Sequence, residues 1–387
     1  MKPMYDNTPT PIAITGMGVV TPLGNTLEEL WLSLLDNRSS AQTWSDLADE
    51  GFRVTNACRI ATFESAKTAR GKAMAIAAAK SALHDAMAPL NRRLGVFVGT
   101  TMGESALFEQ SAETGQAVDL KTASASVYPR AIMAALGIQG ISRAYGNACA
   151  AGNYSLGMAA DMLRRGRIDV AIAGGVDAFS RIAMLGFIRS RAMTPDICSP
   201  FDVDRRGMQL GEAAAFLVLE RLDDARSRGA RVYAGVNSLG LASDAYHATA
   251  PRPDGSGMAA AMRMALTRGQ VSAVDVGFIC AHGSGTRASD TAEATAITGS
   301  FSHRPVVAGY KGALGHSLGA ATAVEAVITA LALGKQIVPS TTNTITLDPT
   351  MDIDLALAQR PLPELRYALN CGYAFGGLNS ALLMEAL

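Results

Sequence analysis

The chain of 387 residues has no excess of charge of either sign, because lysine plus arginine and aspartate plus glutamate each number 34. A protein that binds nucleic acid or an anionic membrane through its overall charge carries a basic excess. The balanced composition therefore excludes that kind of binding as the global function. We expect neither nucleic acid nor a membrane surface as the partner, although a local basic patch remains compatible with the total.

Cysteine is scarce, and its spacing shows no pairing. The five cysteines are Cys58, Cys149, Cys198, Cys280 and Cys371. Their number is odd, and no CxxC pair or other metal-ligand spacing occurs. The sequence therefore predicts no metal site, no disulfide framework, and a reduced, cytoplasmic setting.

The chain also lacks a long apolar segment. Residues 1–11 are polar and contain proline, so no signal peptide is expected. The longest apolar helix that the pattern predicts, residues 320–333, contains Glu325 and is shorter than the roughly 20 residues that span a bilayer. No membrane span is expected.

Glycine, in contrast, is abundant, with 38 residues that gather at the ends of the expected elements. Expected strands cover residues 12–15, 94–98, 141–145, 169–173, 211–219, 276–280, 306–309, 367–370 and 380–384. Expected helices cover residues 27–35, 66–87, 130–136, 150–163, 256–268, 289–298 and 320–333. Alternating strands and helices predict an α/β protein with largely buried sheets. Residues 176–206 are predicted to form an irregular loop, and a loop of that length is usually functional.

The first expected strand leads into Gly16 and Gly18, which resemble the start of a dinucleotide-binding fingerprint. Thr21 occupies the place of the third glycine, and Pro22 follows it. No acidic residue closes a second strand at the required distance. The sequence therefore predicts no NAD binding and no other bound organic cofactor.

Cys149 lies between the expected strand 141–145 and the expected helix 150–163. The N–H groups and the positive dipole end of a helix N-terminus favour a thiolate, so we expect a lowered pKa there. Small neighbours leave room for a bulky group to approach the sulfur. Taken alone, Cys149 fits a buried core cysteine better than a reactive one, because free cysteine is among the most buried residue types.

Two histidines occupy comparable places at other strand ends. His282 follows the strand 276–280, and His316 follows the strand 306–309; glycines stand next to both. In open α/β sheets, ligands gather beyond the carboxyl ends of strands. One cysteine combined with distant histidines is the pattern of a cysteine nucleophile.

These stretches, taken together, resemble a known family. The stretches that carry the resemblance are residues 14–18, 21–24, 147–152, 200–202, 211–214, 281–286, 311–316 and 375–379. In this order, they resemble the elongating β-ketoacyl-acyl carrier protein synthases of the thiolase-fold condensing enzymes. The resemblance implies acyl transfer to a cysteine, followed by decarboxylative condensation with a malonyl unit that extends the chain by two carbons.

The resemblance also implies roles for individual residues. Cys149 would be the nucleophile, and the backbone N–H groups of Cys149 and Phe375 would form its oxyanion hole. His282 and His316 would hold the thioester carbonyl of the malonyl unit while CO₂ leaves. Two donors at that oxygen are what a developing enolate requires. Phe375 would gate the acyl pocket. Which histidine performs which proton step stays open.

Further residues would support this centre. Lys311 resembles the family's lysine beside the histidines, with Glu293 as its partner acid. Ser284 and Thr286 would contact the phosphopantetheine arm, which arrives on the carrier protein. Met102 would line the acyl pocket and limit chain length.

A basic cluster would bind the acidic acyl carrier protein. Its members would be Lys67, Arg70, Lys72 and Arg130. Judged by spacing alone, the first three are compatible with an ordinary solvated helix face. A basic patch in this place would speed and orient docking of the carrier.

The implied architecture has two similar halves, residues 1–230 and 231–387, stacked in five α-β-α-β-α layers. It also implies a dimer, either of two copies or of this chain with a related chain-length factor. Alanines replace the usual hydroxyl residues after Cys149, and residues 103–128 are shorter than usual. These departures leave open the acyl chain length and the choice between fatty-acid and polyketide synthesis.

Three other members of the superfamily were compared. A thiolase requires a second reactive cysteine in the last glycine turn, whereas Cys371 lies before that turn. An initiating synthase has asparagine where His316 stands. A non-catalytic chain-length factor lacks the nucleophile that Cys149 provides. The active subunit of a heterodimer remains an alternative to a self-sufficient synthase.

Overall fold

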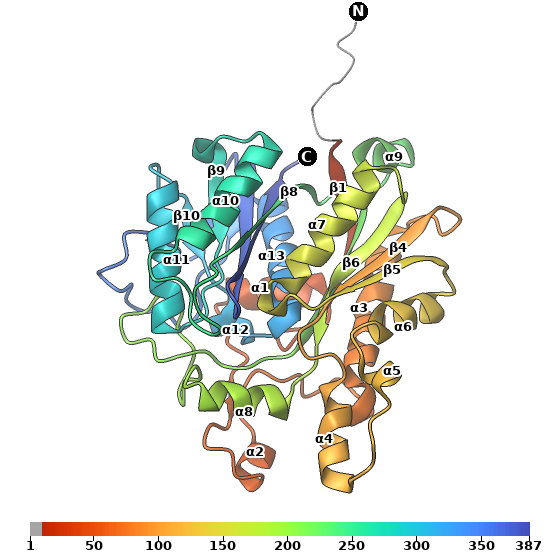
Figure 1. Cartoon of the computed structure of the whole chain (residues 1–387). Helices are drawn as coiled ribbons and strands as arrows, with labels where there is room; N and C mark the ends of the chain where they lie inside the picture. The colour runs from red at the N-terminus through yellow and green to blue at the C-terminus, as the bar shows by residue number, and fades with distance from the viewer. Residues whose placement is uncertain (1–9) are drawn as a thin grey trace, which may run out of the picture.

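The computed structural model describes residues 10–387 (Figure 1). Its main sheet has 11 strands. They are β1 (Ile12–Val20), β4 (Leu94–Gly99), β5 (Gly140–Tyr145), β6 (Val170–Asp177), β7 (Ala213–Arg221), β8 (Ala234–Ser243), β9 (Val276–Cys280), β10 (Val306–Ala308), β12 (Asp354–Leu355), β14 (Tyr367–Ala374) and β15 (Leu378–Glu385). Two small ribbons pair β2 (Gln42–Thr43) with β3 (Asn56–Ala57) and β11 (Ile337–Val338) with β13 (Arg360–Pro361).

The same strand order occurs twice in this sheet. The first half has the order β5-β4-β6-β7-β1, and the second half has the order β10-β9-β14-β15-β8. In both halves the first three strands are parallel, and the last two run antiparallel to their neighbours. The halves join where Ile12–Ile14 of β1 pairs with 234–236 of β8. This repeated strand order is what the predicted division of the chain into two similar halves requires.

The helices are α1 (Leu27–Leu35), α2 (Ser45–Asp49), α3 (Arg70–Ala86), α4 (Ser105–Thr114), α5 (Leu120–Ala123), α6 (Val127–Leu136), α7 (Ala151–Arg164), α8 (Arg181–Arg189), α9 (Leu222–Ser227), α10 (Ser256–Gly269), α11 (Arg287–Ser300), α12 (Lys311–Leu314) and α13 (Ala321–Lys335). In Figure 1, α7 and α13 lie in the middle, and both contact strands of the two halves. Helices α3 and α6 cover the outer face of one half, and α10 covers that of the other. The predicted fold class, a five-layer α-β-α-β-α sandwich, is confirmed.

Helix α13 explains why the middle layer is helical. Every residue from Ala321 to Leu333 is buried, and a helix that is apolar all round belongs inside a protein. The helical stretch Leu318–Lys335 is longer than the predicted 320–333. By length and composition alone it could span a bilayer, but 89% of it is buried within the protein.

The segment 176–206 is not the irregular loop that the sequence predicted. It contains α8, whose first turn is capped by Ser180, since the Ser180 hydroxyl accepts a hydrogen bond from the N–H of Ala183. The two prolines that suggested a loop lie only after this helix, at Pro195 and Pro200. Helix α8 therefore places side chains such as Phe187 beside the loop that follows β14.

Candidate active site

Cys149 lies in a 3-10 turn, Ala148–Ala150, that leads from β5 into α7. Ala148 has a φ of 48°, in the left-handed region that non-glycine residues rarely adopt. The second half repeats this arrangement, because the 3-10 turn Leu318–Ala320 leads into α13 and Leu318 has a φ of 52°. The repeated turns bring the N-termini of the two central helices together. Cys149 therefore faces the loops of the second half.

The predicted low pKa of Cys149 is wrong in direction. Burial raises the pKa of its thiol to about 12, while the charge of Lys311 acts in the opposite sense. Only 7% of the residue is exposed, so the loss of hydration outweighs the charge of Lys311. The thiol is protonated at rest, and its proton has to leave as the sulfur attacks.

His282 and His316 stand side by side near the sulfur. Their ring centres are 5.3 Å apart, with the planes at 77°. Burial, followed by the charge of Lys311, holds the pKa of both imidazoles well below the usual range. Both are therefore neutral at pH 7. The Nδ1 atom of His316 accepts a hydrogen bond of 3.1 Å from the N–H of Leu318, which places its own proton on Nε2.

Lys311 anchors the backbone of His282, but its partner acid differs from the prediction. The Lys311 Nζ atom donates to the carbonyl oxygen of His282 and lies 2.6 Å from a carboxylate oxygen of Glu325. Burial lowers the pKa of Lys311, yet the charge of Glu325 outweighs it and keeps the amine protonated.

Glu293 binds backbone instead. Its carboxylate accepts the N–H groups of His282 at 2.7 Å and Gly283 at 2.8 Å. The assignment of Glu293 as the partner of Lys311 was therefore wrong. Both glutamates still act on His282. Glu293 accepts the N–H group of His282, and Glu325 holds Lys311 at the carbonyl oxygen of His282.

Two backbone donors remain free beside Cys149. Within residues 10–387, the N–H groups of Cys149 and Phe375 have no hydrogen-bond acceptor. Phe375 precedes Gly376 and Gly377, whose φ values of 84° and 71° turn the chain sharply. Its ring is 39% exposed and lies 5.5 Å from that of Phe187 on α8. A free pair of N–H groups of this kind suits a negatively charged oxygen.

A cavity of about 330 Å³ joins these groups. Its lining includes Cys149, His282, His316, Ser284, Thr286 and Phe375, which come from both halves of the chain. No group of three or more metal-binding side chains occurs in the part of the chain that the structure describes. The structure thus brings together the residues that the sequence predicted for the nucleophile, the histidine pair, the gate and the arm contacts.

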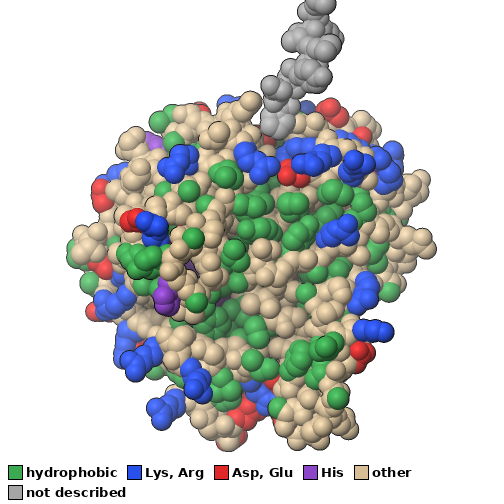
Figure 2. Space-filling view, in the orientation of Figure 1, with side chains coloured by type: hydrophobic (Ala, Val, Ile, Leu, Met, Phe, Trp, Pro, Cys, Tyr) green, Lys and Arg blue, Asp and Glu red, His purple; other side chains and the backbone are tan. Residues whose placement is uncertain are grey.

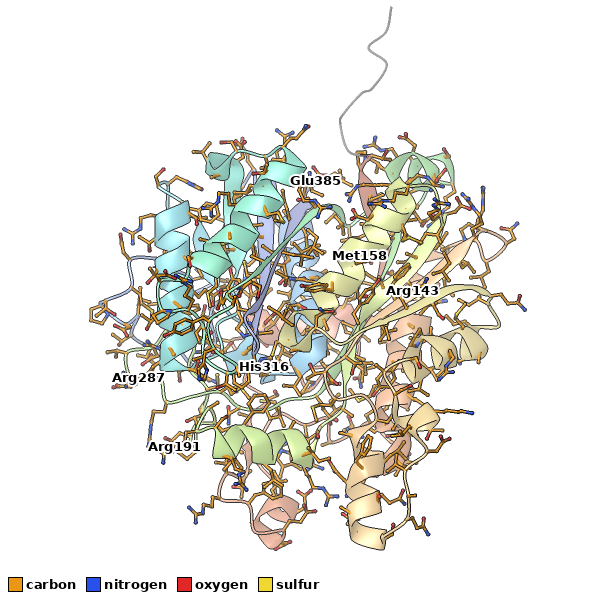
Figure 3. All side chains as sticks on the ribbon, viewed as in Figure 1. Arg143, Met158, Arg191, Arg287, His316 and Glu385 are labelled. Carbon is orange, nitrogen blue, oxygen red and sulfur yellow. The ribbon has the colours of Figure 1, made fainter. Side chains whose placement is uncertain are left out.

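The cavity also has basic residues that the sequence analysis missed. Arg191 and Arg287 line it, and both are exposed. Figure 3 shows them beside α8 and below α11, with His316 further inside. The signal for Arg287 was present, because it directly follows the predicted Thr286. Arg191 was hidden in the segment 176–206 that was expected to be irregular.

Met102 does not line this cavity. Its N–H group donates to the carboxylate of Asp177, which also accepts from Thr100, Thr101 and Gly319. Its side chain packs in a cluster around Leu47 and Met184. The assignment of Met102 to the acyl pocket stays a prediction.

The predicted carrier-binding cluster is not uniform. Lys67 and Arg130 are exposed, and Lys72 is half-buried. Arg70 instead pairs with the buried carboxylate of Glu212 at 2.7 Å and donates to two backbone carbonyl oxygens. Four of its five N–H donors are engaged within the chain, so Arg70 stabilises the fold, and its assignment to docking stays a prediction.

Comparison with known proteins shows the family of this chain. Residues 9–225 match the family model described as "Beta-ketoacyl synthase, N-terminal domain", and residues 233–344 match "Beta-ketoacyl synthase, C-terminal domain". The chain is 32% identical over 413 residues to 3-oxoacyl-[acyl-carrier-protein] synthase 2 of Vibrio cholerae, covering 97% of this chain and 99% of that protein. It is 32% identical over 404 residues to the protein of the same name from Staphylococcus aureus (strain COL), covering 97% and 98%.

Solved structures give the same result for the fold. One described as the ishigamide ketosynthase/chain length factor superposes with a TM-score of 0.92 at 35% identity, covering 98% of this chain and 99% of that chain. A β-ketoacyl synthase from Burkholderia phymatum STM815 superposes with a TM-score of 0.91 at 28% identity, covering 98% and 100%. Both family models and these relatives span the two halves that meet at Cys149, His282 and His316. The chain therefore belongs to the β-ketoacyl synthase family of condensing enzymes.

Proposed function

We propose that this enzyme takes an acyl chain onto Cys149 and condenses it with a malonyl unit, with both substrates carried as thioesters on acyl carrier protein. The observation that carries the proposal is the single cavity in which Cys149, two neutral histidines and two free backbone N–H groups meet. The names of the curated relatives, 3-oxoacyl-[acyl-carrier-protein] synthase 2, support the carrier-bound substrate.

The first step is acyl transfer. The sulfur of Cys149 attacks the carbonyl carbon of the acyl thioester, and the oxygen that becomes negative lies against the N–H groups of Cys149 and Phe375. A neutral imidazole takes the thiol proton, because the raised pKa of Cys149 makes spontaneous ionisation rare. The carbon–sulfur bond to the carrier breaks, and the carrier thiol leaves with that proton.

The second step is condensation. The bond between the malonyl carboxylate and its methylene carbon breaks, CO₂ leaves, and the electron pair forms an enolate. His316 donates through Nε2–H to the enolate oxygen, and His282 is the second group beside it. The methylene carbon then attacks the acyl carbon, the bond to Cys149 breaks, and the cysteine thiolate takes up one proton. One 3-oxoacyl carrier, one CO₂ and one free carrier thiol result.

Removing His316 separates the two steps. In His282→Ala or His316→Ala, decarboxylation of malonyl carrier falls by about 10²–10³-fold, because one donor to the enolate is lost. Acyl loading of Cys149, followed by intact mass, falls much less in His316→Ala, because the proton on Nε2 makes His316 a donor and not the base for the thiol. The measurement is CO₂ release from labelled malonyl carrier, with His84→Ala on the exposed face of α3 as the matched control. Equal losses in loading and decarboxylation would contradict the assigned roles.

The carrier arm enters past Ser284 and Thr286. Their hydroxyl groups lie 2.9 Å apart in the cavity lining, where they can bind the amide groups of a phosphopantetheine arm. The arm is a part of the carrier, so this proposal needs no bound organic cofactor. Arg191 in the cavity lining and Lys67 in the turn before α3 are exposed cations that suit an acidic carrier protein.

Charge reversal tests this docking. Arg191→Glu and Lys67→Glu each raise KM for the carrier-bound substrate about 5–10-fold with little change in kcat, since they alter encounter rather than chemistry. The effect shrinks at high salt. Lys80→Glu serves as the control. Lys80 is also exposed, but it lies on α3 about 20 Å from Lys67 along the helix axis. An unchanged KM in both variants would exclude carrier docking at these residues.

A second candidate function is the active subunit of a heterodimer. The structure at 35% identity is described as a ketosynthase/chain length factor. Another, at 27% identity and a TM-score of 0.90, is described as a type II PKS acyl-carrier protein in complex with its ketosynthase bound to the hexaketide. The first description supports a chain length factor as the partner subunit, and the second supports an acyl carrier protein as a partner. Condensation by the isolated chain would favour the self-sufficient enzyme, whereas activity only after addition of a partner would favour the heterodimer.

A further inference from the structure

One buried carboxylate connects loops of the two halves. Asp177 ends β6 and is fully buried. Its two oxygens accept four hydrogen bonds, from the hydroxyl group of Thr100 at 2.7 Å and from the N–H groups of Thr101 at 2.8 Å, Met102 at 2.9 Å and Gly319 at 2.7 Å. The first three donors follow β4 in the first half, whereas Gly319 lies in the second half.

The carboxylate of Asp177 is held by uncharged donors. Burial raises its pKa to about 6, and the four hydrogen bonds act in the opposite sense. The group is therefore mainly ionised at pH 7. Hydrogen bonds to an ionised acceptor are stronger than those between neutral groups, so Asp177 holds both loops firmly.

The bond to Gly319 holds a strained turn. Gly319 follows Leu318, whose φ of 52° is a conformation that persists only where the surroundings hold it. A methyl group at Gly319 would lie 2.6 Å from backbone atoms of Thr100 and Thr101, so the turn lies directly against the loop of the first half. Asp177 binds the turn at this close approach.

The same turn orients the ring of His316. The N–H group of Leu318 donates to Nδ1 of His316 at 3.1 Å, which leaves the proton of His316 on Nε2. Adjacent N–H groups of one turn therefore bind two acceptors, the imidazole through Leu318 and the Asp177 carboxylate through Gly319. The position of this carboxylate determines where the donor to Nδ1 lies.

Asp177 acts on the site without touching it. It does not line the cavity, and Figure 2 shows hydrophobic side chains and no acidic one in the hollow above α8. The backbone of His316 is held independently, because its N–H group donates to Gln209 and its carbonyl oxygen accepts from Gly211. Asp177 therefore affects the ring of His316 rather than the backbone that carries it.

We infer that Asp177 is a positioning residue for decarboxylation, which acts through the turn 318–320 to keep Nε2–H of His316 directed at the enolate oxygen. The inference rests on the proposed function, because that function makes His316 a donor to the enolate. It extends the set of residues that control condensation to the end of β6, outside the cavity.

Removing the carboxylate tests the inference. In Asp177→Ala, kcat for decarboxylation of malonyl carrier falls about 10–100-fold, because a small displacement of a catalytic group is enough for such a loss. KM for malonyl carrier stays within about 2-fold. Burial, and to a smaller degree the charge of Asp177, raises the pKa of Cys149, so loss of this charge does not slow acyl loading.

Two variants of the same network serve as controls. In Asp177→Asn the amide oxygen can stay on Gly319 and Thr101, while the amide nitrogen donates to the hydroxyl group of Thr100. Thr100→Val removes one hydrogen bond to the carboxylate and leaves that from Gly319. We expect both variants to decarboxylate within about 3-fold of wild type, since each loses a single hydrogen bond far from His316.

A double variant shows whether Asp177 acts through His316. Once His316→Ala has removed the imidazole, adding Asp177→Ala lowers decarboxylation by no more than about 2-fold further. Losses that multiply would overturn the inference, because Asp177 would then act independently of His316. A rate in Asp177→Ala equal to that of wild type would overturn it as well.

Circular dichroism verifies that each variant is folded. Asp177→Ser replaces an alanine variant that does not fold, because its oxygen is one bond closer to the backbone and does not reach Gly319. The same loss of kcat is expected for it. A normal rate in His316→Ala alone would refute the proposed role of His316, and the inference with it.

Discussion

Replacing Cys149 with alanine abolishes loading of the acyl chain, and the intact mass of the variant stays unchanged after incubation with acyl carrier. Turnover falls by about 10⁴-fold or more, as is usual when the nucleophile is removed. No second sulfur can take over, because Cys149 is the one cysteine in the cavity lining. The measurement compares intact mass and 3-oxoacyl carrier formation in wild type and variant.

The same variant keeps part of the chemistry. The histidine pair and Lys311 remain in place, so malonyl carrier still loses CO₂, but the enolate has no acyl group to attack and is protonated. Cys371→Ala is the matched control, since it removes a buried thiol that does not line the cavity. Acyl loading in Cys149→Ala, or its loss in Cys371→Ala, would show that the nucleophile has been misassigned.

Lys311→Met is expected to affect both stability and catalysis. It leaves the carboxylate of Glu325 buried without its cation, which costs about 3–5 kcal/mol of unfolding free energy. It also removes the donor at the carbonyl oxygen of His282, so decarboxylation falls as it does in the histidine variants. Chemical denaturation and CO₂ release measure the two effects.

The destabilisation depends on pH in a defined direction. Burial already raises the pKa of Glu325 to about 7 beside Lys311, and removal of the cation raises it further. A carboxyl whose folded pKa lies above its unfolded value of about 4.3 stabilises the fold once it is protonated. The variant therefore gains stability as the pH falls from above 7 toward about 4.3, and loses it again as the pH rises.

The paired variant Lys311→Met/Glu325→Leu separates the two roles of the lysine. Replacing both members of a buried ion pair by apolar groups removes the unpaired charge, so stability returns toward that of wild type. Decarboxylation stays low, because the donor at His282 is still missing. Recovery of activity in the paired variant would mean that Lys311 acts only on stability.

The alternation of strands and helices was visible in the sequence because buried strands and amphipathic helices have different periods. Helix α8 was not predicted, because the prolines further along drew its segment into an expected loop. Its cap at Ser180 and its apolar residues Phe187 and Ile188 were the available signals. The doubled strand order could not be read from periodicity, since pairing between strands is a property of the folded chain.

In the site, Cys149, His282 and His316 were predictable because each follows a strand and stands near glycine. Glu325 was noticed only as an interruption of an apolar helix. A single carboxylate in a wholly buried helix requires a cation, and that rule points to the buried Lys311. The raised pKa of Cys149 could not be predicted, because it depends on how completely both halves cover the sulfur.

The position of α7 and α13 between the two halves of the main sheet has a consequence for biosynthesis. While a ribosome makes the chain, residues 10–230 emerge first, with one apolar side of α7 waiting for a helix that ends only at Lys335. Until then the nascent N-terminal half carries an uncovered inner surface, which is the condition in which partly made proteins aggregate. We therefore expect slow synthesis of the second half to lower the yield of folded enzyme.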